Sequence, residues 1–168
     1  MKVNIIGVAS AIIALASLAL PWWTMTISLL KTPFSWDMYT WGVGSPTEGD
    51  ALLFDFADSY GYAALAFIVV GAILRLAGSV TVRRRGWTIL ATSGILIILA
   101  AVIFVAGLAA DPALADATPS IGIFESKEVT ILEFSYSIST YLHIGFLLAI
   151  IAAILASISL LRHPIASS

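Results

Sequence analysis

Four apolar segments, each about as long as a membrane is thick, constrain this chain more than any other feature. They cover about residues 3–20, 59–80, 87–110 and 138–161. A helix needs about 20 apolar residues to cross a hydrocarbon core of ~30 Å. Pro21 follows the first segment, Asp111-Pro112 closes the third, and Pro164 lies just beyond the fourth, as expected where helices end. The sequence therefore predicts an all-α membrane fold, a bundle of four transmembrane helices in one domain, residues 1–168.

The composition supports this prediction. Of the 168 residues, 60% are hydrophobic and 11% are charged, against roughly 25% charged residues in an ordinary soluble domain. A secretory signal peptide would explain the first segment alone, and Pro21-Trp22-Trp23 is unlike a small-residue cleavage site, so we expect that segment to be retained. The net charge of −2 gives no reason to expect a nucleic-acid partner.

The basic residues predict the orientation of the chain. Six of the eight lie near the termini or the short middle connection: Lys2, Arg75, Arg83, Arg84, Arg85 and Arg162. Lys and Arg are retained in the cytoplasm. We therefore expect a multi-pass protein of the cell membrane with both termini cytoplasmic, and with the connections at residues 21–58 and 111–137 outside.

Scarce residue types narrow the chemistry. The chain has no Cys, which excludes disulfides and thiolate metal sites. Asn4 is the only Asn and there is no Gln. Hyperthermophile proteins use these heat-labile residues sparingly, so a thermophilic, archaeal source would explain the bias, as would drift or GC-rich coding.

Small residues recur at four-residue spacing within the apolar segments. The pairs include Gly7 with Ala11 and Ala149 with Ala153. Such spacing lets helix backbones approach closely in lipid, although an Ala-rich helix also produces such pairs by chance. We expect close packing of the helices into one bundle.

The two outer connections are too long for simple turns and carry strand patterns. Apolar and polar residues alternate over 23–29 and again over 34–38, the period of a half-buried strand. Residues 129–137 are rich in the β-branched and aromatic types that strands prefer. We expect these segments to form a small extracellular antiparallel sheet, with turn regions at Gly42–Gly49 and 116–120.

Aromatic residues gather in the first outer connection, and we take them as candidate interaction residues. They are Trp22, Trp23, Phe34, Trp36, Tyr39 and Trp41. Trp and Tyr favour the lipid headgroup region, which would make this cluster an interfacial belt. They are also enriched at protein–protein hot spots, which would make it a partner-binding face. The sequence supports both interpretations.

The order of these segments resembles the claudin and peripheral-myelin-protein superfamily of four-span proteins. The similar features are a long strand-bearing first outer segment that begins with Trp22-Trp23, a short basic turn, and a second outer segment with a strand. The family's Gly-Leu-Trp motif followed by two cysteines is absent, and Trp41-Gly42 is the nearest local match. The resemblance implies a fold and leaves the function open.

Few residues in the chain suggest chemistry. No P-loop, GxSxG or HExxH motif is present. Arg75 lies near the cytoplasmic end of its predicted helix, where we expect its side chain to reach the membrane surface. His143, one turn inside the fourth predicted helix, is a lone histidine in that region. Arg83-Arg84-Arg85 could contact anionic lipid headgroups as well as set topology. We therefore expect no enzyme activity, cofactor or metal.

Three function classes fit these features. The first is a non-catalytic interaction protein, either a homo-oligomer or an accessory subunit bound to other membrane subunits. The second is a subunit of a respiratory or quinone-linked membrane enzyme complex, with His143 or the carboxylates of the outer connections near a partner's cofactor. The third is a small-molecule transporter, for which the apolar segments offer no polar groups at mid-membrane.

Overall fold

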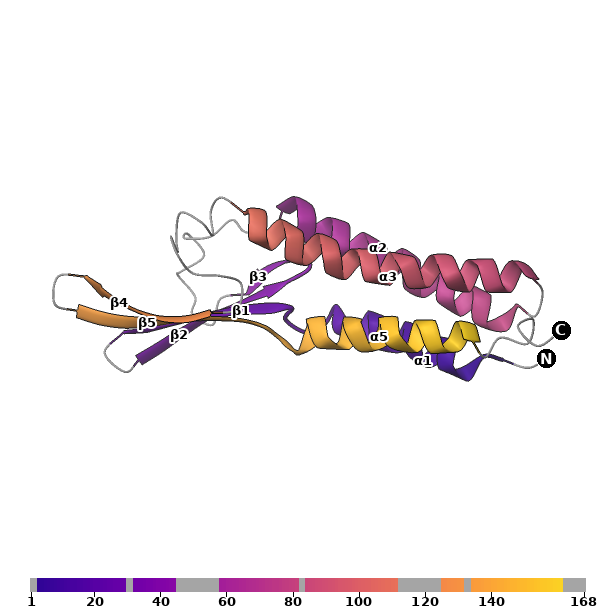
Figure 1. Ribbon diagram of the computed structural model, residues 1–168, viewed down its shortest axis with the longest axis horizontal. Coiled ribbons are helices and arrows are strands. Elements are labelled where there is room, and N and C mark those ends of the chain that lie inside the picture. Colours follow the sequence, from indigo (N-terminus) through magenta and orange to yellow (C-terminus); the bar gives the residue numbers. More distant parts are fainter. Residues whose placement is uncertain are drawn as a thin grey trace.

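The computed structural model describes residues 3–29, 32–44, 58–81, 84–111, 125–131 and 134–161. In these ranges four helices lie side by side along one long axis (Figure 1): α1 (Ile5–Ser17), α2 (Asp58–Val80), α3 (Arg84–Ala110) and α5 (Ile144–Leu161). Each of α1 and α3 packs against both α2 and α5. The strands lie at one end of the bundle, here called the sheet end, and α2 ends and α3 begins at the far end (Figure 1). The predicted turns at Pro46–Gly49 and 116–120 lie outside the described residues.

Among the described helices, three are long and apolar enough to cross a membrane: α2, α3 and α5. The fourth, α1, has 13 residues and ends at Ser17, so the predicted end at residue 20 is wrong. The main-chain N–H groups of Leu18 and Ala19 bond three residues back, to Leu15 and Ala16, which tightens the last turn. Pro21 then prevents the helix from continuing.

The predicted start of the last helix at residue 138 is also wrong, because α5 begins at Ile144. Residues 138–142 belong instead to strand β5 (Phe134–Leu142), which pairs with β1 (Trp23–Leu29). These five residues mix apolar and hydroxyl side chains, and so short a segment suits the start of a helix as well as the end of a strand. Here pairing with β1 makes residues 138–142 part of a strand.

The described strands form one antiparallel sheet in the order β3-β2-β1-β5-β4. β1 pairs with β2 (Thr32–Tyr39) within the first outer connection. The predicted pairing between the two outer connections is confirmed by β1 with β5. Two details were predicted wrongly. Gly42–Gly44 forms the short strand β3 rather than a turn. The single strand expected at 129–137 is a hairpin of β4 (Glu125–Ile131) and β5.

The register gives the sheet two different faces. Trp23, Met25 and Ile27 of β1 share one face with their partners on β2 and β5, which are all apolar except Thr140. Thr24 and Thr26 lie on the opposite face, which is rich in hydroxyl groups. Near the helices the apolar face is buried, whereas the outer parts of β1, β2, β4 and β5 extend well beyond the helix ends (Figure 1).

Small side chains let α1 and α5 approach closely, as expected from their spacing. Ala11, Ala149 and Ala153 are all buried. Gly7 is buried too, but it faces Ser79 of α2. The hydroxyl of Ser10 donates a hydrogen bond of 2.8 Å to the main-chain oxygen of Ala152 on α5. Such interhelical hydrogen bonds stabilise packing where no hydrophobic force acts between helices.

Candidate functional site

Two of the six candidate aromatic residues, Trp22 and Trp23, lie in the protein core. Their side chains are 0% and 1% exposed. The Trp22 ring packs edge to face with Phe104 of α3, at 5.0 Å, and with Phe146 of α5, at 5.8 Å. Its indole N–H donates to the main-chain oxygen of Ser17, at the end of α1. Trp22 therefore joins three helices beneath the sheet, and neither tryptophan contributes to a free surface.

Trp41 and Tyr39 lie where the sheet meets the bundle. The Trp41 indole N–H donates a hydrogen bond of 3.1 Å to the main-chain oxygen of Leu18, and its ring stacks on Tyr39 at 4.7 Å. Trp41 is 50% exposed. Its hydrogen bond satisfies a carbonyl left free at the end of α1, so Trp41 has a structural role and a surface position at once.

The other two candidates, Phe34 and Trp36, lie farther out on β2. Phe34 pairs with Ile27 of β1, and Trp36 pairs with Met25. Phe34 is 40% exposed, whereas Trp36, Ile27 and Tyr136 are partly buried. We call Ile27, Phe34, Trp36 and Tyr136 the distal apolar face, since the register places them on one face of the sheet.

The opposite face of the sheet carries hydroxyl groups in rows across the strands. Ser35, Thr26, Ser139 and Ser126 form one row from β2 to β4. The Thr26 and Ser35 hydroxyls lie 2.9 Å apart, as do those of Ser126 and Ser139. Because these hydroxyls bond one another, this face needs no partner to satisfy them.

Sequence reasoning missed the most unusual group in the bundle, the side chain of Arg75. It is fully buried, so the expectation that it reaches the membrane surface is wrong. Its Nη1 donates a hydrogen bond of 3.0 Å to the Leu90 main-chain oxygen on α3. Its Nε and Nη2 have no hydrogen-bond partner in the described part of the chain. The available signal was its place as a charged residue inside an apolar span, where ionisable groups face the bundle interior.

Two of the three remaining basic candidates, Arg84 and Arg85, lie at the far end. α3 begins at Arg84, and Arg85 is exposed there. Arg83 lies outside the described residues. Contact of this cluster with lipid headgroups stays a prediction.

His143 is not inside the last helix but directly before it, between β5 and α5. Its main-chain N–H donates to the Trp22 oxygen, and its Nδ1 is buried without a hydrogen-bond partner in the described structure. Over the described ranges, no group of three or more His, Asp or Glu side chains could hold a metal ion.

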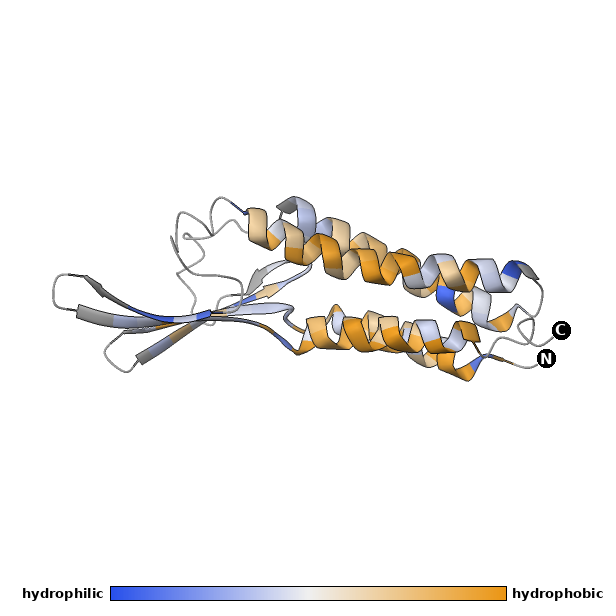
Figure 2. Cartoon of the chain, viewed as in Figure 1, coloured by the Kyte–Doolittle hydropathy of each residue, from blue (hydrophilic) through white to orange (hydrophobic). Residues whose placement is uncertain are grey.

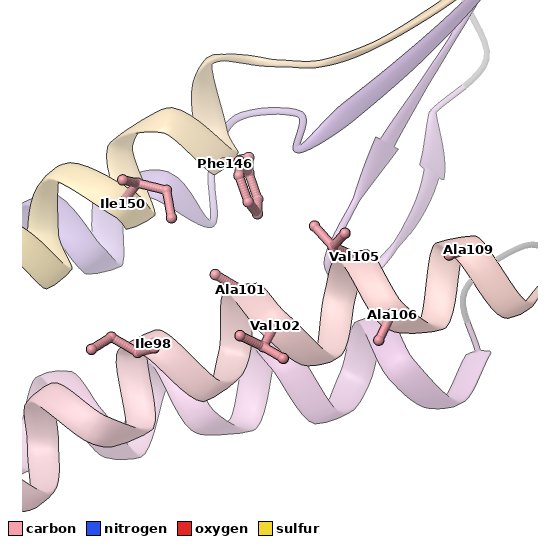
Figure 3. A pocket seen from close by; sticks show the side chains of 8 residues that line it. All are labelled: Ile98, Ala101, Val102, Val105, Ala106, Ala109, Phe146 and Ile150. Atoms are coloured by element: carbon pink, nitrogen blue, oxygen red, sulfur yellow. The ribbon is translucent and has the colours of Figure 1, made fainter. Parts of the chain in front are cut away.

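An apolar hollow of about 420 Å³ lies between α3 and α5, close to the sheet end (Figure 3). It is lined by Ile98, Ala101, Val102, Val105, Ala106, Ala109, Phe146 and Ile150. Figure 3 shows Phe146 reaching from α5 toward α3, beside Val105. The hollow had no signal in the sequence, because it depends on how the two helices diverge.

Comparison with known protein families and curated proteins assigns the chain to no family. No protein-family model matches it, and no curated protein matches it. Its helices and small antiparallel sheet are compatible with a claudin-like architecture. Together with three helices of membrane-spanning length, this suggests the class of helical membrane proteins with an appended sheet.

Proposed function

We propose that the chain is a non-catalytic four-span membrane protein that acts through protein–protein contacts of its sheet. The partner is a second copy of the chain or another subunit of a larger membrane complex. In this proposal both termini and the α2–α3 connection lie in the cytoplasm, and the sheet lies outside.

The distribution of polar residues supports the membrane placement. The helices are mostly apolar, whereas the strands are largely polar (Figure 2). Arg85 is exposed at the far end, where the excess of basic residues favours the cytoplasm. Although α1 has 13 residues, the whole stretch from Val3 to Leu20 is apolar except Asn4 and two serines within the helix.

The observation that carries the proposal is the distal apolar face. Ile27, Phe34, Trp36 and Tyr136 share one face of the sheet, and the strands that carry them extend past the helices (Figure 1). Phe34 keeps 40% of its surface exposed. Aromatic side chains beside polar surroundings are typical anchors of protein interfaces.

The distal apolar face lies too far from the end of the bundle to be explained as a belt of residues in the lipid headgroup layer. Ile27 lies four residues beyond Trp23, or about 13 Å at the rise of a strand. The headgroup layer on one side of a membrane is only about 5–8 Å thick. The strands continue along the long axis of the bundle (Figure 1). Trp41 and Tyr39, at the bundle end, suit a belt; Phe34 and Ile27 lie too far out for one.

The edge of the sheet is a weaker candidate for the contact. β4 is the last strand in the order, and Glu125, Lys127 and Glu128 on it are exposed. Charged side chains on an edge strand discourage the addition of another strand. The face of the sheet is therefore favoured over its β4 edge as the contact surface.

Purification from native membranes in a mild detergent tests the proposal. We expect an oligomer or a fixed partner to accompany the wild-type chain, and the Trp36→Ala and Phe34→Ala variants to lose it. Tyr141→Ala is the matched control, because Tyr141 is 44% exposed on the hydroxyl face. A wild-type monomer without partner, or equal loss in the Tyr141→Ala variant, would overturn the proposal.

A further inference from the structure

The apolar hollow between α3 and α5 has no role in the proposed contacts of the sheet. Its lining residues on α3 recur at three- and four-residue steps from Ile98 to Ala109, a single stripe along the helix. Ala101, Ala106 and Ala109 leave room where larger residues would fill the space between the helices. Phe146 of α5 packs against Trp22 and so borders the hollow with the core.

The lining fixes the chemistry of an occupant. All eight lining residues have apolar side chains, and the main-chain groups of α3 and α5 are bonded within their helices. A polar ligand would lose its hydrogen bonds with water and gain none here, which costs several kcal/mol per group. Hydrocarbon is therefore the chemical class that fits.

The size of the hollow separates a lipid chain from a partner helix. Its volume of about 420 Å³ falls in the ~300–1,000 Å³ range of small-molecule sites. It follows α3 for 11 residues, about 17 Å at the helical rise. Beyond it on α3 lies the bulky, exposed side chain of Ile95, whereas close packing of another helix in lipid favours small residues along the contact.

We propose that this hollow holds one hydrocarbon chain of an outer-leaflet membrane lipid. The proposal shares the membrane placement of the proposed function, since it needs the sheet end to face outward, but not its protein contacts. At this depth lipid chains are the solvent, and Ile98, Val102 and Ile150 on the rim are exposed toward it. If the hollow were empty, the side chains of its walls would lack dispersion contacts on one side. A lipid hydrocarbon chain that enters from the side supplies these contacts and stabilises the bundle.

Photolabelling tests this proposal directly. The protein would be reconstituted in phosphatidylcholine vesicles containing a phosphatidylcholine with a diazirine in one acyl chain, and adducts would be mapped by mass spectrometry. We expect adducts on Ala101–Ala109 and Ile150 to exceed those on Ile73 of α2, which is 58% exposed to bulk lipid. Equal labelling of the two faces would overturn the proposal, because it would mean transient contact only.

A variant whose side chain fills the hollow provides a second test of the proposal. The Ala106→Phe variant should lower the hollow's adducts to the level found on Ile73, because the added ring occupies the space and the wall contacts that a lipid chain would use. Ala66→Phe on the exposed side of α2 is the matched control and should leave them unchanged. An isoprenoid quinone recovered at one per chain from native membranes, or adducts joining two chains through α3, would assign the hollow to another occupant and overturn the proposal. Neither result depends on whether Phe34 binds a partner.

Discussion

The guanidinium of Arg75 on α2 donates a hydrogen bond of 3.0 Å to the main-chain oxygen of Leu90 on α3. The Leu90 oxygen also accepts from the Ser93 hydroxyl, at 2.7 Å. A methyl group added at Gly94 would lie 3.7 Å from Nη2 of Arg75 and 3.6 Å from Ala156 of α5. A charged group thus lies where α2, α3 and α5 meet, about 8 Å from the end of α2 at the helical rise.

Replacement of Arg75 by Met should stabilise the protein by about 1–4 kcal/mol, as found when buried charges give way to apolar residues of similar volume. Met keeps most of the volume and removes a charge whose Nε and Nη2 have no hydrogen-bond partner in the described structure. Arg75→Ala should instead destabilise it, because a cavity is left. Thermal unfolding in detergent measures both effects.

Leu76→Met on the exposed side of the same helix is the control, and should change little. If Arg75→Met is as destabilising as Arg75→Ala, the guanidinium contributes stability through contacts beyond the Leu90 hydrogen bond.

Replacement of Trp22 by Ala should destabilise the protein by about 3–5 kcal/mol, the usual cost of removing a buried aromatic side chain. The change removes two edge-to-face ring contacts and the hydrogen bond to Ser17. Trp41→Ala should cost only about 1 kcal/mol, since that residue is half exposed and loses one hydrogen bond. Equal shifts in unfolding temperature would refute the assignment of Trp22 to the core and Trp41 to the surface.

Gly145 should tolerate no side chain. A methyl group there would meet the main-chain oxygens of Leu20 and Pro21 at 2.5 and 2.6 Å. We expect Gly145→Ala to cost about 1–3 kcal/mol, as for other overpacked sites. Gly94→Ala is the matched change, because its methyl group would make only ordinary contacts. It should be neutral or stabilising by up to about 1 kcal/mol through helix propensity. Unfolding curves in which the two variants coincide would show that the chain does not turn closely against α5.

The orientation of the chain can be read from single cysteines, since the native sequence has none. In intact cells a membrane-impermeant maleimide should label the Ser126→Cys variant, on the exposed part of β4, and spare the Arg85→Cys variant. The reverse pattern would place the sheet in the cytoplasm and contradict the proposed topology.

Much of the fold could be predicted, because its signals are local. The alternation over residues 23–29 requires one buried and one polar face, and β1 shows both. The strand β4 gave no such signal, because Glu125, Ser126, Lys127 and Glu128 are all exposed at the edge of the sheet. Its place depends on pairing with β5 rather than on its own pattern.

The candidate site could be predicted only in part. A run of aromatic residues indicates that some of the rings are buried and that others bind a partner. It does not indicate which rings are buried and which are free to bind. The depth of Trp22 depends on Phe104 and Phe146, more than 80 residues away in the sequence. The burial of Arg75 likewise depends on Gly94 and on the approach of α5. Such long-range packing leaves no periodic pattern in the sequence.

The most direct test of the proposed function is photocrosslinking from the distal apolar face in native membranes. The Phe34→Cys variant and the Tyr141→Cys variant would each be modified with benzophenone maleimide and irradiated. The proposal predicts a defined crosslinked product, with a second copy or one membrane subunit, from the Phe34→Cys variant and none from the Tyr141→Cys variant. Equal products from both variants, or no product from either, would contradict it.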